Sequence, residues 1–285
     1  MTLDTTSATL PGYAQVAAKY GFEDAASVLQ GDVNAGLNAC VECCDRHTGG
    51  HRVALRCIAV DDTLTEYTFE QLRDLSAKAA NVFAAAGVGP GDVVAGLLPR
   101  TVELVATVLG AWRLGAVYQP LFTAFGPKAI EHRLHTSNAR LVVTNSANRA
   151  KLDDIPGHPP VATVVADGAA LPAGDIDFRA ALAQAPADFA PVLRKGDDLF
   201  MMMSTSGTTG LPKGVPVPLR ALAAFSAYMR FAVGLREGDV FWNIADPGWA
   251  YGLYYAICGP LLLGQATTLY EGGFTAESTW RVIQR

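Results

Sequence analysis

The sequence predicts an α/β protein in which a parallel or mixed sheet is covered by helices on both faces. Segments with the apolar period of a helix alternate along the chain with short β-branched runs, which is the pattern of such a sheet. Half of the 285 residues are hydrophobic and 17% are charged, so the chain can bury a large core. This length fits one large domain or two smaller ones.

The elements follow from these patterns in order along the chain. Apolar periodicity predicts helices over residues 33–47, 69–86, 101–114, 127–137, 219–231 and 250–262. Strands are expected at residues 53–59, 92–97, 141–144, 162–165, 199–203 and 239–245. Another strand is expected to open near Gln265, and the residues before Arg285 have a helical pattern.

The segment from Ile155 to Pro191 predicts a division of the chain. It is rich in Pro, Ala and Asp, and we interpret it as a looping connection between two lobes. The expected organisation is an N-terminal extension over residues 1–30, a first α/β subdomain over 31–190, and the start of a second subdomain over 191–285.

The run Thr-Ser-Gly-Thr-Thr-Gly-Leu-Pro-Lys-Gly, from Thr205 to Gly214, is the most specific feature of the sequence. It lies between apolar residues 199–203 and 215–217, so it is expected to connect two short strands as an exposed loop. Glycines let backbone N–H groups turn toward an anion, hydroxyl groups add donors, and the lysine adds a positive charge. The run therefore predicts a socket for a polyphosphate.

Two other phosphate motifs fail on this sequence. A Walker loop would need Gly-Lys-Ser/Thr five residues after Gly207, but that position is Pro212. The run from Gly87 to Gly91 imitates a dinucleotide fingerprint, yet it follows an expected helix and precedes an expected strand, which is the reverse order. A P-loop kinase or other P-loop phosphotransferase is accordingly disfavoured.

The phosphate run resembles the signature of the adenylate-forming superfamily, which includes acyl-CoA synthetases, luciferases and peptide adenylation domains. The segment from Tyr67 to Ala95 and the run Asp246-Pro247-Gly248-Trp249 are similar to the same superfamily. Together with residues 37–47, they look most like the acetyl-CoA and medium-chain acyl-CoA synthetase branch. The resemblance covers residues 30–285 and implies the fold of the N-terminal domain of these enzymes.

The resemblance implies an AMP-forming reaction with ATP, Mg²⁺ and coenzyme A. A short- to medium-chain carboxylate forms an acyl adenylate and releases pyrophosphate, and coenzyme A then takes the acyl group. The residues that would bind the ATP phosphates are Thr205, Ser206, Gly207, Thr208, Thr209, Gly210 and Lys213. None of these is certain to be catalytic, since the adenylation lysine of the family belongs to a part with no counterpart here.

Trp249, Ala250, Tyr251 and Gly252 are the candidate lining of the acyl pocket, again by resemblance. A plainer interpretation is that Trp249 anchors a helix start in the core while the carboxylate of Asp246 caps that helix. Tyr251 is bulky, which would favour a short acyl group.

Later motifs of the family have no counterpart in these 285 residues. We therefore expect a partial N-terminal domain that is feeble or inert alone, because closure by a second domain would be needed to complete the site. The alternative is a non-catalytic nucleotide-binding remnant or regulator, which would bind ATP and form no adenylate.

Charge and composition exclude other classes. The net charge is −5, and the sequence contains no cluster of Lys and Arg of the kind that nucleic-acid binding normally requires. No export signal is visible, so the cytoplasm is the expected location. Residues 247–270 contain no charge, but their glycines and prolines favour a buried helix and a strand over a membrane span.

Other polar clusters favour structural roles. Cys40 and Cys43 have the spacing of half a zinc site, but no second pair exists, so we expect core thiols without disulfides and no metal. Residues 45–47 (Asp-Arg-His) and 132–135, with His132, Arg133 and His135, favour polar helix faces or ion pairs. Arg100 follows an expected strand, where open sheets bind ligands, so it is a stronger candidate.

Overall fold

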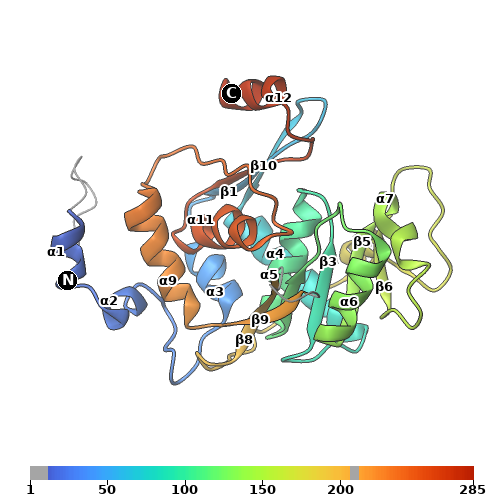
Figure 1. Cartoon of the computed structure of the whole chain (residues 1–285), viewed down its shortest axis with the longest axis horizontal. Coiled ribbons are helices and arrows are strands. Elements are labelled where there is room, and N and C mark those ends of the chain that lie inside the picture. The colour runs from blue at the N-terminus through green and yellow to red at the C-terminus, as the bar shows by residue number, and fades with distance from the viewer. Residues whose placement is uncertain (1–11, 206–211) are drawn as a thin grey trace.

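The larger of the two sheets in the molecule is a mixed sheet of seven strands (Figure 1). The structure is a computed structural model that describes residues 12–205 and 212–285. The strand order is β7-β6-β5-β3-β4-β8-β9, and all neighbours are parallel except β8 and β9. The strands are β3 (Val93–Leu97), β4 (Val117–Pro120), β5 (Ala139–Asn145), β6 (Val161–Val164), β7 (Ile176–Asp177), β8 (Leu199–Thr205) and β9 (Lys213–Pro218).

Helices cover both faces of this sheet. Val94 of β3 packs into a core that includes residues of α4 (Phe69–Ala85) and α5 (Val102–Arg113). Its neighbours Val93 and Ala95 point into a second core, which holds Ile130 and Leu134 of α6 (Pro127–Ser137). Because successive residues of a strand point to opposite faces, the two cores confirm the predicted α/β architecture.

A second, three-stranded sheet joins early and late parts of the chain. Its order is β10-β1-β2, with β1 (Val53–Ile58), β2 (Leu64–Thr68) and β10 (Thr267–Tyr270). β1 pairs in parallel with β10 and antiparallel with β2. The expected strand after Gln265 is therefore confirmed as the edge of this sheet.

The remaining helices pack around the two sheets. They are α1 (Tyr13–Ala17), α2 (Phe22–Ala26), α3 (Ala39–Cys43), η1 (Asp45–His47), α7 (Ser146–Arg149), η2 (Ala150–Leu152), α8 (Phe178–Gln184), α9 (Ala221–Tyr228), η3 (Met229–Val233), α10 (Ala250–Gly252), η4 (Leu253–Cys258), α11 (Gly259–Leu262) and α12 (Ala276–Ile283). The three segments α10, η4 and α11 form one helical stretch, which precedes the fully buried strand β10. None of the helices in the described ranges is long and apolar enough to cross a membrane.

Two sequence predictions were wrong at the level of single elements. Residues 239–245 do not form a strand, because only Trp242 reaches a partner, in one isolated bridge to Thr268. The helix predicted over 33–47 begins only at Ala39, where the side chain of Asn38 caps it by accepting from the amide of Cys40 at 2.9 Å. The residues before Asn38 pair instead with the segment near Arg194.

The segment between Ile155 and Pro191 is more ordered than the looping connection we expected, since it contains β6, β7 and α8. Asp177 caps α8 by accepting from the amide of Ala180 at 3.0 Å, and the buried ring of Phe178 stacks 6.0 Å from Phe83. Strands β8 and β9 extend the same sheet beyond residue 191. The division of the chain into subdomains there stays a prediction.

Candidate active site

The two ends of the predicted phosphate loop lie side by side. Thr205 ends β8, Lys213 begins β9, and the two residues are direct partners in the antiparallel register. Both are exposed, and they lie at the carboxyl end of β8. Ser206, Gly207, Thr208, Thr209 and Gly210 fall outside the described residues. The hairpin therefore places one hydroxyl group and one ammonium group at a sheet edge where open α/β sheets bind ligands.

Helix α6 contacts this hairpin where β9 begins. Nε2 of His132 lies 2.8 Å from the carbonyl oxygen of Pro212, and because a carbonyl only accepts, the ring nitrogen donates. A Cβ on Gly214 would lie 4.0 Å from Cγ2 of Thr136, so α6 runs along the start of β9. The ring of His135, on the same helix, is exposed. In the described part of the hairpin, the hydrogen bond from this helix comes from His132.

Trp249 lies at the surface, where it packs against other aromatic side chains, and not in the core. Its side chain is 43% exposed. The ring centroid lies 5.7 Å from that of Phe122 and 5.5 Å from that of Phe125, in the loop after β4. The guanidinium carbon of Arg133 stands 4.0 Å above the ring of Phe125. A partly exposed indole with aromatic neighbours suits a pocket wall better than a core anchor.

One segment thus contacts both halves of the candidate site. The rings of Phe122 and Phe125 pack against Trp249. His132, in the second turn of α6, donates a hydrogen bond to the carbonyl of Pro212, just before β9. Sequence reasoning missed Phe122 and Phe125. Their position directly after a buried strand of the sheet was the available signal, because ligands bind at the carboxyl ends of such strands.

A tight turn presents Trp249. Oδ1 of Asp246 accepts from the amide of Gly248 at 2.8 Å, and the carbonyl of Asp246 accepts from the amide of Trp249 at 3.0 Å. Asp246 is therefore a turn residue, while Trp249 itself occupies the N-cap position of α10. A Cβ on Gly248 would lie 2.5 Å from Cα of Phe122, so only glycine fits there.

The other candidate pocket residues have different surroundings. Tyr251 is 49% exposed and belongs to a tyrosine cluster, with its hydroxyl 3.5 Å from that of Tyr228. This hydrogen bond raises the pKa of Tyr251. Ala250 is half-buried. Gly252 is buried, and a Cβ there would lie 2.1 Å from the carbonyl oxygen of Asp246, so this residue serves the packing of the turn.

Residues 45–47 form ion pairs and buried contacts, as expected. Asp45 pairs with the buried Arg113 at 2.5 Å, and Arg46 pairs with Glu42 at 2.8 Å. Burial, with the charge of Arg46 as a second cause, lowers the pKa of His47 to about 4. These side chains stabilise the joint between α3 and its neighbours.

The cysteines are free thiols. Cys40, Cys43, Cys44 and Cys258 are fully buried, and the Sγ atoms of Cys43 and Cys258 lie 3.9 Å apart in a thiol hydrogen bond and not in a disulfide. Burial raises the pKa of Cys43 well above its ordinary value. Within residues 12–205 and 212–285, no three His, Cys, Asp or Glu side chains gather where a metal ion would sit.

Comparison with known proteins identifies the family. The family described as AMP-binding enzyme matches residues 44–285. Acetyl-coenzyme A synthetase of Bacillus subtilis is 34% identical over 254 residues, which cover 87% of this chain and 44% of the relative. Acetyl-coenzyme A synthetase of Novosphingobium aromaticivorans is 30% identical over 276 residues, covering 87% of this chain and 42% of that protein.

A solved structure agrees with this assignment. The crystal structure of an acyl-CoA synthetase from Brucella canis is similar with a TM-score of 0.94 and 66% sequence identity, covering 97% of this chain and 51% of that chain. The chain belongs to the AMP-binding enzymes, the adenylate-forming family that includes acyl-CoA synthetases. It spans about half the length of the relatives it matches.

Proposed function

We propose that the protein is an AMP-forming acyl-CoA synthetase, which joins a carboxylic acid to coenzyme A with ATP as the activating substrate. The observation that carries the proposal is the β8–β9 hairpin, which pairs Thr205 with Lys213 at the carboxyl end of the sheet. The proposal is supported by the family match and by the names of the similar synthetases.

The chemistry has two steps. A carboxylate oxygen attacks the α-phosphorus of ATP, and the bond to pyrophosphate breaks. The thiol sulfur of coenzyme A then attacks the acyl carbon, AMP leaves, and the thiol proton passes to solvent. Charge builds on phosphate oxygens in the first step, so positioned donors and cations are what the protein must supply. In this proposal the hydroxyl of Thr205 and the ammonium of Lys213 bind the β and γ phosphates, together with residues 206–210.

Magnesium fits this proposal as part of the nucleotide substrate. Phosphate oxygens are preferred ligands of Mg²⁺, which usually keeps few protein ligands in such sites. Its chemistry would be to neutralise charge on the phosphates. Lys213 would share this task from the protein side.

The acyl group is proposed to lie against Trp249 and Tyr251. Both side chains are partly exposed and belong to aromatic groups that come from several elements. Tyr251 is bulky, which would favour short or medium acids over long ones. Residues Ala250 and Gly252 complete this stretch of backbone.

Exchange of labelled pyrophosphate into ATP tests the proposal. The chain, and any longer product of the same gene, are assayed with acetate, propionate, octanoate and benzoate. Acid-dependent exchange that decreases in Lys213→Ala and changes its acid preference in Trp249→Ala is the expected result. ATP binding without exchange in either polypeptide would favour the non-catalytic nucleotide-binding alternative, and ATP bound with equal affinity by Lys213→Ala would contradict the phosphate site.

A further inference from the structure

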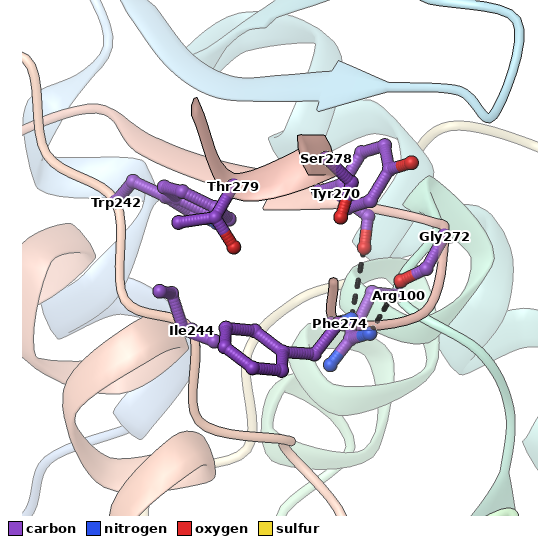
Figure 2. A pocket seen from close by; sticks show the side chains of 8 residues that line it. All are labelled: Arg100, Trp242, Ile244, Tyr270, Gly272, Phe274, Ser278 and Thr279. Atoms are coloured by element: carbon purple, nitrogen blue, oxygen red, sulfur yellow. Dashed lines mark hydrogen bonds between the residues drawn. The ribbon is translucent and has the colours of Figure 1, made fainter. Parts of the chain in front are cut away.

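Arg100, three residues after the end of β3, contacts two segments that are distant from it in sequence. Its Nε donates to the carbonyl of Tyr270 and its Nη2 to the carbonyl of Gly272, both at 2.8 Å (Figure 2). Its Nη1 donates to Oδ2 of Asp246 at 3.2 Å. The guanidinium therefore ties the end of β3 both to the chain after β10 and to the turn before Trp249.

These contacts use three of the five N–H groups of the guanidinium and favour a structural role for Arg100 over that of a ligand-binding cation. Every guanidinium nitrogen already donates to the protein, and the side chain is only 19% exposed. The small pocket beside Arg100 has apolar walls from Trp242, Ile244 and Phe274 (Figure 2). The hydroxyl of Thr279 in this pocket donates to the carbonyl of Thr275 at 2.7 Å. Among the described residues that line this pocket, Arg100 alone is charged, and each of its three nitrogen atoms donates to the protein, so we expect its effect to pass through the residues it binds.

Asp246 carries that effect to Trp249. One carboxylate oxygen accepts from Arg100, and the other accepts from the amide of Gly248 at 2.8 Å. The backbone of Gly248 is pressed against Phe122, and the ring of Trp249 lies on the same phenylalanine. An arginine that holds one carboxylate oxygen leaves the other fixed in direction, since the two oxygens move as one rigid group.

We infer that Arg100 is a positioning residue that sets the orientation of the Asp246–Trp249 turn, and through it the wall of the acyl pocket. The importance of this wall for catalysis rests on the proposed function, whereas the coupling of Arg100 to the turn does not. A planar fork suits this role, because its N–H groups are spread over three nitrogen atoms, whereas the three donors of a lysine ammonium share one nitrogen.

Hydrogen exchange of the amides of Gly248 and Trp249 tests the coupling without any need for activity. Arg100→Met, Arg100→Lys and the control Arg73→Met are compared, because Arg73 pairs with its neighbour Asp74 at the surface and is 44% exposed. We expect roughly tenfold faster exchange at the turn in Arg100→Met, a smaller increase in Arg100→Lys, and no change in the control. The amides of α5 should keep their protection in all three variants.

Two results would overturn the inference. Unchanged exchange at Gly248 and Trp249 would show that Arg100 does not hold the turn. An equal increase in α5 would show a loss of global stability only.

Kinetics separate this inference from the proposed function. In the active protein, Arg100→Met should raise KM for the carboxylate about fivefold and leave KM for ATP unchanged, because only the acyl wall is displaced. A rise in both constants would contradict a role confined to the turn. One outcome is that Arg100→Met speeds amide hydrogen exchange at the turn while no acid supports ATP–pyrophosphate exchange in the unmodified protein. In that case the proposed function fails, and the coupling of Arg100 to the turn stands.

Discussion

The two ends of the candidate site are built in different ways. Thr205 and Lys213 meet through the register of one hairpin, and His132 donates a hydrogen bond to the carbonyl of Pro212. The turn that presents Trp249 depends on Arg100, which is 146 residues away from Asp246 in sequence, and on close packing against Phe122. The phosphate end is thus mainly a local structure, whereas the acyl end is held by distant parts of the chain.

Two glycine substitutions give the largest expected contrast between these ends. Gly252→Ala would place a Cβ 2.1 Å from the backbone oxygen of Asp246, so we expect a loss of about 3 kcal/mol in the free energy of unfolding. Gly214→Ala in the hairpin would meet Sδ of Met202, a flexible side chain, at 3.2 Å and Cγ2 of Thr136 at an ordinary 4.0 Å, and should change stability by about 0.5 kcal/mol or less. Denaturant titration measures both, and equal losses would contradict the contrast.

Lys213→Ala should affect the phosphate end alone. A hydrogen bond to a charged group contributes about 1.5 to 3 kcal/mol, so ATP affinity should fall roughly ten- to a hundredfold while some exchange activity remains. Calorimetric titration with ATP measures the change. Lys78→Ala is the control, and Trp249→Ala should leave ATP affinity unchanged. Unaltered affinity in Lys213→Ala would remove the hairpin from the phosphate site.

Low pH should lower the stability of the fold through His47, which contacts α11 in the helical stretch that follows Trp249. Nε2 of His47 lies 3.2 Å from the carbonyl oxygen of Leu262 in α11, and burial lowers the pKa of His47 from 6.5 to about 4. The unfolded chain therefore takes up a proton before the folded one does, so stability is complete above pH 6.5 and is lost as the pH falls toward 4.

We expect this loss to be roughly 1 to 2 kcal/mol, measured as the free energy of unfolding across that pH range. His47→Gln should flatten this part of the pH profile, because glutamine does not titrate. An unchanged profile in the variant would assign the acid sensitivity to other groups.

The smallest expected effect comes from His132→Ala. The lost hydrogen bond to Pro212 should weaken ATP binding about two- to tenfold and leave KM for the carboxylate unchanged. His135→Ala, an exposed position on the same helix, is the matched control. An effect on the carboxylate as large as that on ATP would show that α6 supports both ends of the site equally.

Elements with strong local signals could be predicted closely from the sequence. The helix predicted over 127–137 has these bounds in the structure, with Pro127 in its first turn and Asn138 in the left-handed conformation after its end. Helix α4 begins after Thr68, whose hydroxyl accepts from the amide of Gln71 while the side chain of Gln71 accepts from the amide of Thr68. Such caps are contacts between near neighbours, so the sequence shows them directly.

Elements that depend on distant partners could not be predicted in this way. Residues 239–245 have the apolar pattern of a strand, but only one bridge forms beside β10. Residues 33–37 have a helical pattern, yet Leu37 exchanges two backbone hydrogen bonds of 2.9 Å with Arg194. In both cases the tertiary neighbour decided which backbone hydrogen bonds were made.

The sequence by itself determined the α/β class, most of the helices and strands, and the family signature between Thr205 and Gly214, because these depend on the order of residues within short segments. Only the tertiary structure decided that Arg100 binds Asp246, that Phe122 and Phe125 support Trp249, and that His132 binds the carbonyl of Pro212. These contacts join residues far apart in the chain, and their partners are set by how the sheets and helices pack, which no local pattern specifies.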